Sequence, residues 1–491
     1  MAKEKEMTAR DVDIDRSPDG KIYIPEKMEL DEAVIWLQRR RKEQEQTVAF
    51  HEIIGAFPPD GAVALMKAMK EQFGWTAMST VKGMFGDNPP VMIDVEIGPG
   101  ESIKVPWGQF EIPGVQGFVR TAVTMKDGVM AFVLTGEVKQ KHYHILTELA
   151  QRTRKFVNEQ SIYRGRAFSI EFNDEGEGEF GTMEGPKFLD LVTVKPEELI
   201  FSADLHKAVN DYIFTPILKA EECEAAGVPV KRGICLLGPF GTGKTLIAYV
   251  AAKHCEEVGR TFVYLRDVRH LSDAIKFAQQ YAPAVVFAED IDRVVSGERT
   301  GAIDEILNTL DGVDSKESKV MVIMTTNNIE KVNRAMLRPG RIDVALTIGP
   351  PDAEAAERLV HQYSRGLLVK GIDLEDVGKQ LDGQIPALIR EAVERAKLSA
   401  IARGEKKLAI TSADLLLAAR TLVEHINLMN EEEQDQTPIV TRFAKEMGTA
   451  FGAGVRSSEY NDILSPAEMQ ALRKSNRAGS LGLHKKTEET L

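Results

Sequence analysis

The sequence has little cysteine, and it has neither a long apolar run nor an apolar leader. Its three cysteines are too few and too scattered for a disulfide framework or a zinc cluster, and they fit a reducing cytoplasm: Cys223, Cys235 and Cys255. No apolar run reaches the roughly 18 residues that a membrane-spanning helix needs. The first residues, MAKEKEMTARDVDID, are charged throughout and lack the apolar core of a signal peptide. We therefore expect a soluble cytoplasmic protein without a membrane span.

Excess positive charge is also missing. The formal net charge is −13, which argues against a protein that coats nucleic acid or an anionic membrane through bulk charge. The basic run at 39–42 is typical of a solvated helix face, although a local contact with phosphates stays open. A zinc protease is disfavoured, because His51-Glu52 is not followed by the second histidine that its metal site needs.

The length of 491 residues predicts two to four domains. We expect a flexible leader at 1–28 and an α+β N-terminal domain at 29–185 that recognises a substrate or partner. Within it, the pattern is helical from Leu30 to Met69 and β-like from 91 to 137, with Lys126-Asp127-Gly128 as a hairpin turn and a long helix near 141–159. Residues 423–491 form a partly disordered C-terminal extension that opens with a linker at 430–435.

Residues 186–350 alternate short apolar segments with helical stretches. This alternation predicts an α/β fold, a parallel sheet with helices on both faces, followed by a small helical lid domain at 351–422. The five expected strands are 233–237, 261–265, 284–288, 320–324 and 344–348.

A phosphate-binding loop lies between the first of these strands and an apolar helix. Its sequence is Gly238-Pro239-Phe240-Gly241-Thr242-Gly243-Lys244-Thr245. The glycines let backbone N–H groups approach phosphates, Lys244 can reach the β- and γ-phosphates, and the Thr245 hydroxyl can ligate Mg²⁺. The pattern therefore predicts binding of ATP together with Mg²⁺.

A pair of carboxylates follows the strand 284–288. Glu289 and Asp290 stand at the carboxyl end of a sheet strand, where an open α/β sheet places its ligand. One should hold Mg²⁺ through water, and the other should orient the water that attacks the γ-phosphate. Because successive strand residues point to opposite faces, the two cannot share one role.

With these motifs, residues 186–422 resemble the AAA family of ATPases. The resemblance rests on Gly227–Gly233, Leu307–Val313, Thr325-Thr326-Asn327 and Ala335–Asp343. It implies that Thr245 and Glu289 serve Mg²⁺ and that Asn327 positions the lytic water with Asp290. It further implies that Arg338 and Arg341 are arginine fingers that reach a neighbouring subunit's nucleotide, as expected in a homo-hexameric ring.

Three features depart from that family. The carboxylates stand in the order Glu-Asp instead of Asp-Glu, as in a bacterial subgroup, and the lid turn at 383–388 differs from the usual Ser-Gly-Ala-Asp-Leu type. The aromatic–aliphatic–Gly loop with which threading members grip protein is missing after Tyr264, so we expect this tyrosine to be a strand residue. Residues 162–166 and the strands after them resemble the region before the motor in the mitochondrial Rieske-protein translocase group.

The favoured function is a ring-forming ATPase that remodels a protein substrate in a chaperone-like manner. The alternatives are an ATPase stimulated by nucleic acid, against which the acidic charge argues, and a nucleotide-dependent scaffold with slow turnover.

Overall fold

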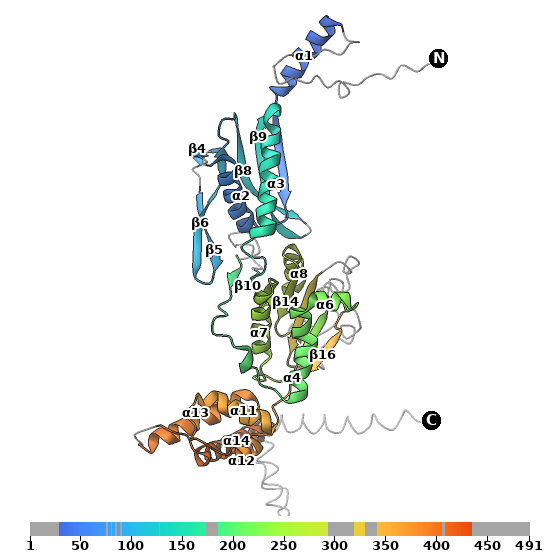
Figure 1. The fold of residues 1–491 in the computed structure, drawn as a ribbon. Coiled ribbons are helices and arrows are strands. Elements are labelled where there is room, and N and C mark those ends of the chain that lie inside the picture. Colours follow the sequence, from blue (N-terminus) through green and yellow to red (C-terminus); the bar gives the residue numbers. More distant parts are fainter. Residues whose placement is uncertain are drawn as a thin grey trace, which may run out of the picture. The chain divides into compact units, whose positions relative to one another are not determined.

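The computed structural model describes residues 29–74, 77–79, 81–83, 86–88, 91–126, 128–172, 185–292, 319–328, 341–404 and 408–434 (Figure 1). The expected leader at 1–28 and most of the expected C-terminal extension lie outside these residues. The chain divides into two compact units, residues 1–419 and 420–491. The N-terminal region, the motor and most of the lid thus belong to the first unit.

The N-terminal region is built on an antiparallel sheet in the order β1-β9-β8-β7-β2. Helices α2 and α3 pack against each other and against strands of this sheet. Lys126 pairs with Val129 across the β8–β9 connection, which confirms the predicted hairpin. The elements are α1 (Leu30–Gln44), β1 (Thr47–Ile54), α2 (Pro58–Phe73), β2 (Ala77–Ser79), β3 (Val81–Gly83), β4 (Gly86–Asn88), β5 (Val91–Gly98), β6 (Glu101–Trp107), β7 (Gln109–Glu111), β8 (Gly117–Lys126), β9 (Val129–Lys139), η1 (Gln140–His142) and α3 (Tyr143–Gln160).

Strand β1 corrects the expectation of a helical pattern from Leu30 to Met69. All eight of its residues pair with β9, from Thr47 opposite Lys139 to Ile54 opposite Phe132. The segment TVAFHEII is rich in the β-branched and aromatic residues that suit a pleated, half-buried surface. Its partner lies far along the chain, and a local period does not show such a pairing.

The motor sheet has the order β11-β10-β13-β14-β15-β12-β16 and contains all five predicted strands. They are β12 (Gly233–Leu237), β13 (Thr261–Leu265), β14 (Ala284–Ala288), β15 (Val320–Thr326) and β16 (Val344–Thr347). Neighbouring members of this set are parallel, and β10 (Ala167–Ile170) adds a further parallel strand beside β13. The sheet therefore draws on residues before the expected domain boundary at 185.

Helices cover both faces of this sheet, as predicted. One apolar core contains residues of α7 (Lys244–Glu257), and the core on the other face contains residues of α8 (Leu271–Gln280). The remaining elements of the motor are β11 (Lys187–Phe188), η2 (Pro196–Glu198), α4 (Ala203–Val209), η3 (Asn210–Phe214), α5 (Thr215–Leu218), α6 (Ala220–Ala225) and η4 (Val268–His270).

The N-terminal region shares the α8-side core with the motor. Phe57, Val129 and Met130 belong to the same buried cluster as residues of α8 and β14. The Phe57 N–H donates to the Tyr281 hydroxyl at 2.8 Å, and the Arg164 guanidinium donates to the Ala282 and Gln280 carbonyls at 2.6 and 3.0 Å. The N-terminal region is thus bonded directly to the turn that leads into β14.

A buried carboxylate lies at this junction between the N-terminal region and the motor. Asp60 is 1% exposed and accepts hydrogen bonds from the Ile162 N–H at 2.9 Å and the Ser161 hydroxyl at 2.7 Å. Burial raises the pKa of Asp60, since the charged form loses its solvation, although these hydrogen bonds and the charge of Arg164 oppose this effect.

The lid consists of α11 (Ala353–Ser364), α12 (Glu375–Leu381), α13 (Pro386–Ala402) and α14 (Ser412–Gln434). The last helix is capped: Asp414 accepts from the Thr411 N–H at 2.9 Å, and the Thr411 hydroxyl accepts from the Asp414 N–H at 3.3 Å. Helix α14 continues to Gln434, so the expected linker at 430–435 is helical over most of its length. Glutamate and glutamine are good helix formers, which explains the continuation.

Candidate functional site

The phosphate-binding loop connects β12 to α7 and needs glycine for two reasons. Gly238 has φ of 153°, and a Cβ there would stand 2.1 Å from the Ile348 carbonyl oxygen. Gly243 is the N-cap of α7 with φ of 100°, a left-handed conformation that costs glycine little. The loop therefore aims the first N–H groups of α7 at the space above the sheet, where a phosphate would be stabilised.

Lys244 is 8% exposed and uses all three of its ammonium hydrogens inside the protein. It donates to the Gly238 carbonyl at 2.5 Å, to the Pro239 carbonyl at 2.8 Å and to Asn327 Oδ1 at 2.8 Å. Burial lowers the pKa of Lys244, and nearby carboxylates oppose this effect. Phosphate oxygens would replace these neutral acceptors with charged ones.

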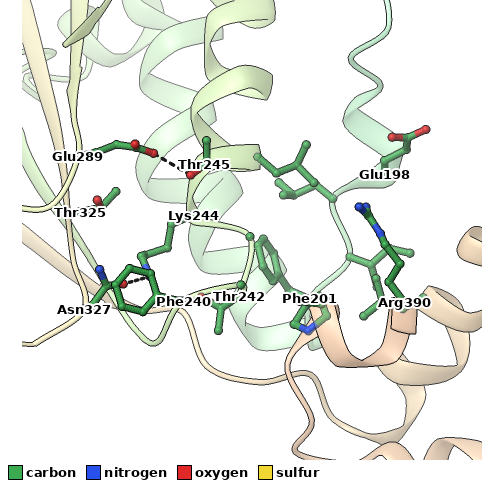
Figure 2. A pocket seen from close by; sticks show the side chains of 18 of the residues that line it. Glu198, Phe201, Phe240, Thr242, Lys244, Thr245, Glu289, Thr325, Asn327 and Arg390 are labelled. Carbon is green, nitrogen blue, oxygen red and sulfur yellow. Dashed lines mark hydrogen bonds between the residues drawn. The ribbon is translucent and has the colours of Figure 1, made fainter. Parts of the chain in front are cut away.

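The two carboxylates after β14 have different partners, as their opposite directions predicted. Glu289 Oε1 accepts from the Thr245 hydroxyl at 2.7 Å (Figure 2). Asp290 Oδ1 instead accepts from the Asn327 side-chain amide at 2.8 Å. The Asn327 side chain also accepts from Lys244. This residue, which follows β15, therefore bridges Lys244 and Asp290. The structure thus brings the sequence-predicted residues of three separate segments together.

Asp290 holds an unusual backbone conformation. Its φ is 51°, a value that non-glycine residues rarely adopt, and its N–H donates to the Thr325 hydroxyl at 3.0 Å. Such strain is retained where the surroundings fix it, often at functional sites. Asp292 lies beside this turn and accepts from the Thr326 hydroxyl at 2.9 Å.

Of the two predicted arginine fingers, the structure describes only Arg341. Arg338 lies outside the described residues. The Arg341 backbone carbonyl packs against Gly233, close to where a Cβ on this glycine would be, and the Asp343 N–H donates to the Gly233 carbonyl at 2.8 Å. Gly233 begins β12 and the phosphate-binding loop follows its end, so about 15 Å of strand separates the Arg341 backbone from the loop. Arg341 is not among the residues that line the nucleotide cavity of its own chain.

A cavity of about 460 Å³ lies over the loop, within the usual size of a small-molecule site. Figure 2 shows Lys244, Thr245, Glu289 and Asn327 on one side of it, and Glu198, Phe201 and Arg390 on the other. No sequence motif marks a site residue on this second side. Its lining comes from the end of η2, from the segment between η2 and α4 and from the lid, and includes Glu198, Leu199, Ile200, Phe201, Leu359, Tyr363, Pro386, Ala387 and Arg390.

The lid is attached to this second side of the cavity. Arg358 of α11 donates to the Phe201 carbonyl at 2.7 Å, and Gln362 donates to the Glu198 carbonyl at 3.3 Å. The unusual lid turn also contacts the phosphate-binding loop, since a Cβ on Gly241 would stand 3.1 Å from the Ala387 Cβ. The apolar wall formed here suits the base and ribose of a nucleotide.

The side chains and backbone groups at this site fit Mg²⁺ and a nucleoside triphosphate. Thr245 and Glu289 offer the hard oxygen ligands that Mg²⁺ takes together with water and phosphate oxygens. Within the described residues no group of three or more His, Cys, Asp and Glu side chains could hold a metal ion by itself. A metal at this site would therefore depend on the phosphates of the nucleotide.

Comparison with known proteins agrees with this geometry. Residues 234–350 match the model of the ATPase family associated with various cellular activities (AAA). These residues form an AAA ATPase domain. The match begins inside β12 and ends after β16, so it contains the phosphate-binding loop, both carboxylates and Asn327.

Curated proteins are also similar to this chain over part of its length. The 26S proteasome regulatory subunit 8 homolog of Schizosaccharomyces pombe is 33% identical over 232 residues, which are 43% of this chain and 57% of the relative. The 26S proteasome regulatory subunit 8 of Caenorhabditis elegans is 29% identical over 238 residues, 44% of this chain and 56% of the relative. This chain therefore spans only a little over half the length of these relatives. None of the described helices is long and apolar enough to cross a bilayer.

Proposed function

We propose that the protein binds ATP with Mg²⁺ and hydrolyses it as one subunit of a ring that remodels a protein substrate. The observation that carries this proposal is the bonded set Lys244–Asn327–Asp290, which stands beside the Thr245–Glu289 pair at the end of the sheet. These groups are the ones that phosphoryl transfer to water requires: a cation for the phosphates, ligands for the metal and a base for the water.

Each residue has a distinct role in this proposal. Lys244 and the N–H groups of the loop hold the phosphates, and Mg²⁺ on Thr245, with Glu289 reaching it through water, neutralises charge on the phosphate oxygens. Asp290 orients the attacking water and accepts its proton, while the Asn327 amide fixes the carboxylate. Arg338 and Arg341 of a neighbouring subunit stabilise the charge of the transition state with their permanently charged planar groups.

The position of Arg341 supports a composite site. Its backbone stands at the beginning of β12, away from its own chain's phosphate-binding loop, so its side chain is better placed for a neighbour's nucleotide than for its own. A head-to-tail contact of this kind closes into a ring, for which we propose six copies. Because the relatives are named as regulatory subunits, a related chain could also be the neighbour. Mass measurement with bound ATP tests this, and a fully active monomer would contradict it.

Two substitutions test the site itself. Asp290→Asn should retain ATP binding and lose at least about a hundredfold in turnover, as expected for removal of a general base. Lys244→Ala should weaken binding of the nucleotide as well, because the phosphates lose their cation. Equilibrium binding of a fluorescent ATP analogue separates the two effects. Unchanged hydrolysis in Asp290→Asn would remove this carboxylate from the mechanism.

A protein substrate is the class that the observations favour. The relatives are regulatory subunits of a proteasome by name. The N-terminal region, outside the AAA match, is bonded through Arg164 to the turn before β14, whose end carries the carboxylates. Capture of bound protein by the Asp290→Asn variant identifies the substrate. Stimulation of ATP hydrolysis by unfolded protein, compared with DNA or RNA, decides between a protein remodeller and a nucleic-acid motor. The three free cysteines support a reducing compartment such as the cytoplasm.

A scaffold with slow turnover is the second candidate, and one observation favours it. Asp290 is one methylene shorter than the glutamate usual at its position, and its backbone is strained at φ of 51°. Both features can place the carboxylate too far from the water. Negligible phosphate release at saturating ATP, together with stable nucleotide-dependent assembly, supports the scaffold and not the motor.

A further inference from the structure

The backbone turn after β14 is held by a threonine of the neighbouring strand. Asp290 has φ of 51°, in the left-handed region that a residue with a Cβ rarely adopts. Its N–H donates to the Thr325 hydroxyl at 3.0 Å, and the Ile291 N–H donates to the Thr325 carbonyl at 2.9 Å. One residue of β15 thus accepts hydrogen bonds from two successive N–H groups of the turn.

Thr325 is itself fixed in place by the sheet. It is 2% exposed and pairs with Leu236 in the parallel register of β12 and β15, while β14 pairs with the other edge of the same strand. The carbonyl of the next residue, Thr326, accepts from the Gly238 N–H of the phosphate-binding loop at 3.2 Å. The Thr325 hydroxyl therefore belongs to a part of the sheet that is bonded on both sides and to the loop.

The backbone and the carboxylate of Asp290 have separate partners at the end of β15. The Thr325 hydroxyl accepts from the Asp290 N–H, and the Asn327 amide donates to the Asp290 carboxylate at 2.8 Å. Both partners line the nucleotide cavity, and Figure 2 shows them on the same side of it. Strained conformations persist only where their surroundings fix them. Without the hydroxyl, the turn can relax toward a commoner conformation that carries the carboxylate away from its present place.

We propose that Thr325 is a positioning residue whose hydroxyl holds the left-handed backbone of Asp290 and so aims its carboxylate at the attacking water. The proposal deepens the proposed function and rests on it. Because the aspartate side chain is short, a change in its backbone conformation displaces the carboxylate almost directly. A displacement of about 1 Å can lower a rate about a hundredfold, since the reacting groups must be aligned.

The test separates turnover from nucleotide binding. The kcat of ATP hydrolysis and the dissociation constant of a fluorescent ATP analogue are measured in Mg²⁺ for the wild type, Thr325→Val and Thr325→Ser. Valine keeps the branched shape of the side chain and removes the hydroxyl, whereas serine keeps the hydroxyl. We expect Thr325→Val to lower kcat at least about tenfold at unchanged affinity, and Thr325→Ser to retain most of the wild-type kcat. If valine does not fold, Thr325→Ala should show the same loss of kcat without adding bulk.

Thr121→Val is the matched control. Thr121 lies in β8, is 4% exposed, and its hydroxyl accepts from the Gly108 N–H at 2.9 Å. This variant therefore also removes a buried hydroxyl that accepts from a backbone N–H, but at a position outside the AAA match. It should leave kcat unchanged, and a loss equal to that of Thr325→Val would assign both effects to general destabilisation and overturn the inference.

The possible outcomes separate this inference from the proposed function. If the wild type does not hydrolyse ATP, or if Asp290→Asn hydrolyses it at the wild-type rate, the proposed function fails. If Asp290→Asn loses turnover and Thr325→Val keeps it, only the role of Thr325 fails. Equal losses of kcat and affinity in Thr325→Val, or a Thr325→Ser variant as slow as Thr325→Val, would also overturn the inference. In an Asp290→Asn background, adding Thr325→Val should cause no further loss in single-turnover hydrolysis, and a multiplied loss would contradict action through Asp290.

Discussion

Removal of one buried hydroxyl should test whether the N-terminal region and the motor fold as a single unit. The Tyr281 side chain is fully buried at the end of α8, and its hydroxyl accepts from the Phe57 N–H at 2.8 Å. Tyr281→Phe keeps the ring among its neighbours Phe277 and Tyr163 and deletes this hydrogen bond.

The expected loss follows from the buried N–H that loses its acceptor. Leaving a buried donor unsatisfied costs about 1–3 kcal/mol. Tyr281→Phe should therefore lower the free energy of unfolding by about 2 kcal/mol. Urea denaturation measures this loss with two signals. Far-UV circular dichroism follows the whole chain, whereas tryptophan fluorescence follows the N-terminal region, since the sequence has only Trp36, Trp75 and Trp107.

Two measured results would contradict this prediction. Because Phe57, Val129 and Met130 lie in one core with α8 and β14, the two signals should give the same midpoint in the wild type. Separate midpoints would show that the shared core does not couple the two parts. The control is Tyr212→Phe, which removes the hydroxyl of a 45% exposed tyrosine. If Tyr281→Phe loses less than about 0.5 kcal/mol of stability, no more than this control, the buried hydrogen bond does not contribute as predicted.

Three further predictions concern the junction, the loop and the ring. The folded-state pKa of Asp60 lies above its ordinary value of 3.8, so its contribution to stability is complete below that pH and is lost as the pH rises through the raised pKa. The wild type should therefore lose stability relative to Asp60→Asn as the pH rises above 3.8, and parallel curves in urea titrations would contradict this. Gly238→Ala should abolish nucleotide binding, because its Cβ would meet the Ile348 carbonyl at 2.1 Å; retained binding in a fluorescence titration would contradict the close approach. An equal mixture of inactive Lys244→Ala and Arg341→Ala chains should recover up to about a quarter of wild-type hydrolysis, since one composite site in four would be intact, and no recovery would contradict a finger supplied by the neighbour.

The elements that the sequence predicted well are those with local signals. The five motor strands are short apolar runs between helices, and the hairpin at Lys126 and Val129 is marked by its Asp-Gly turn. Strand β1 was missed, because its pairing with β9 is non-local and its residues lie between two helices. Strand β10 lies before the expected start of the motor, and only its parallel pairing with β13 places it in the motor sheet.

The candidate site also contains residues that a local motif marks and residues that no motif marks. The loop, Glu289, Asp290 and Asn327 are each marked by a short motif, and the structure joins them by hydrogen bonds. The opposite side of the cavity has no motif. Phe201 lies between η2 and α4, and Tyr363 and Arg390 lie in the lid. None of them belongs to a motif in its own segment.

The sequence by itself determined the chemistry of this protein, because a phosphate-binding loop is built from consecutive residues whose backbone does the binding. Which groups support that chemistry was decided only by the tertiary structure. The place of Arg341 at the far end of β12 and the bonds from Phe57 and Arg164 to the α8–β14 turn join segments that are distant along the chain. Such contacts depend on strand order and register, which a linear pattern does not contain.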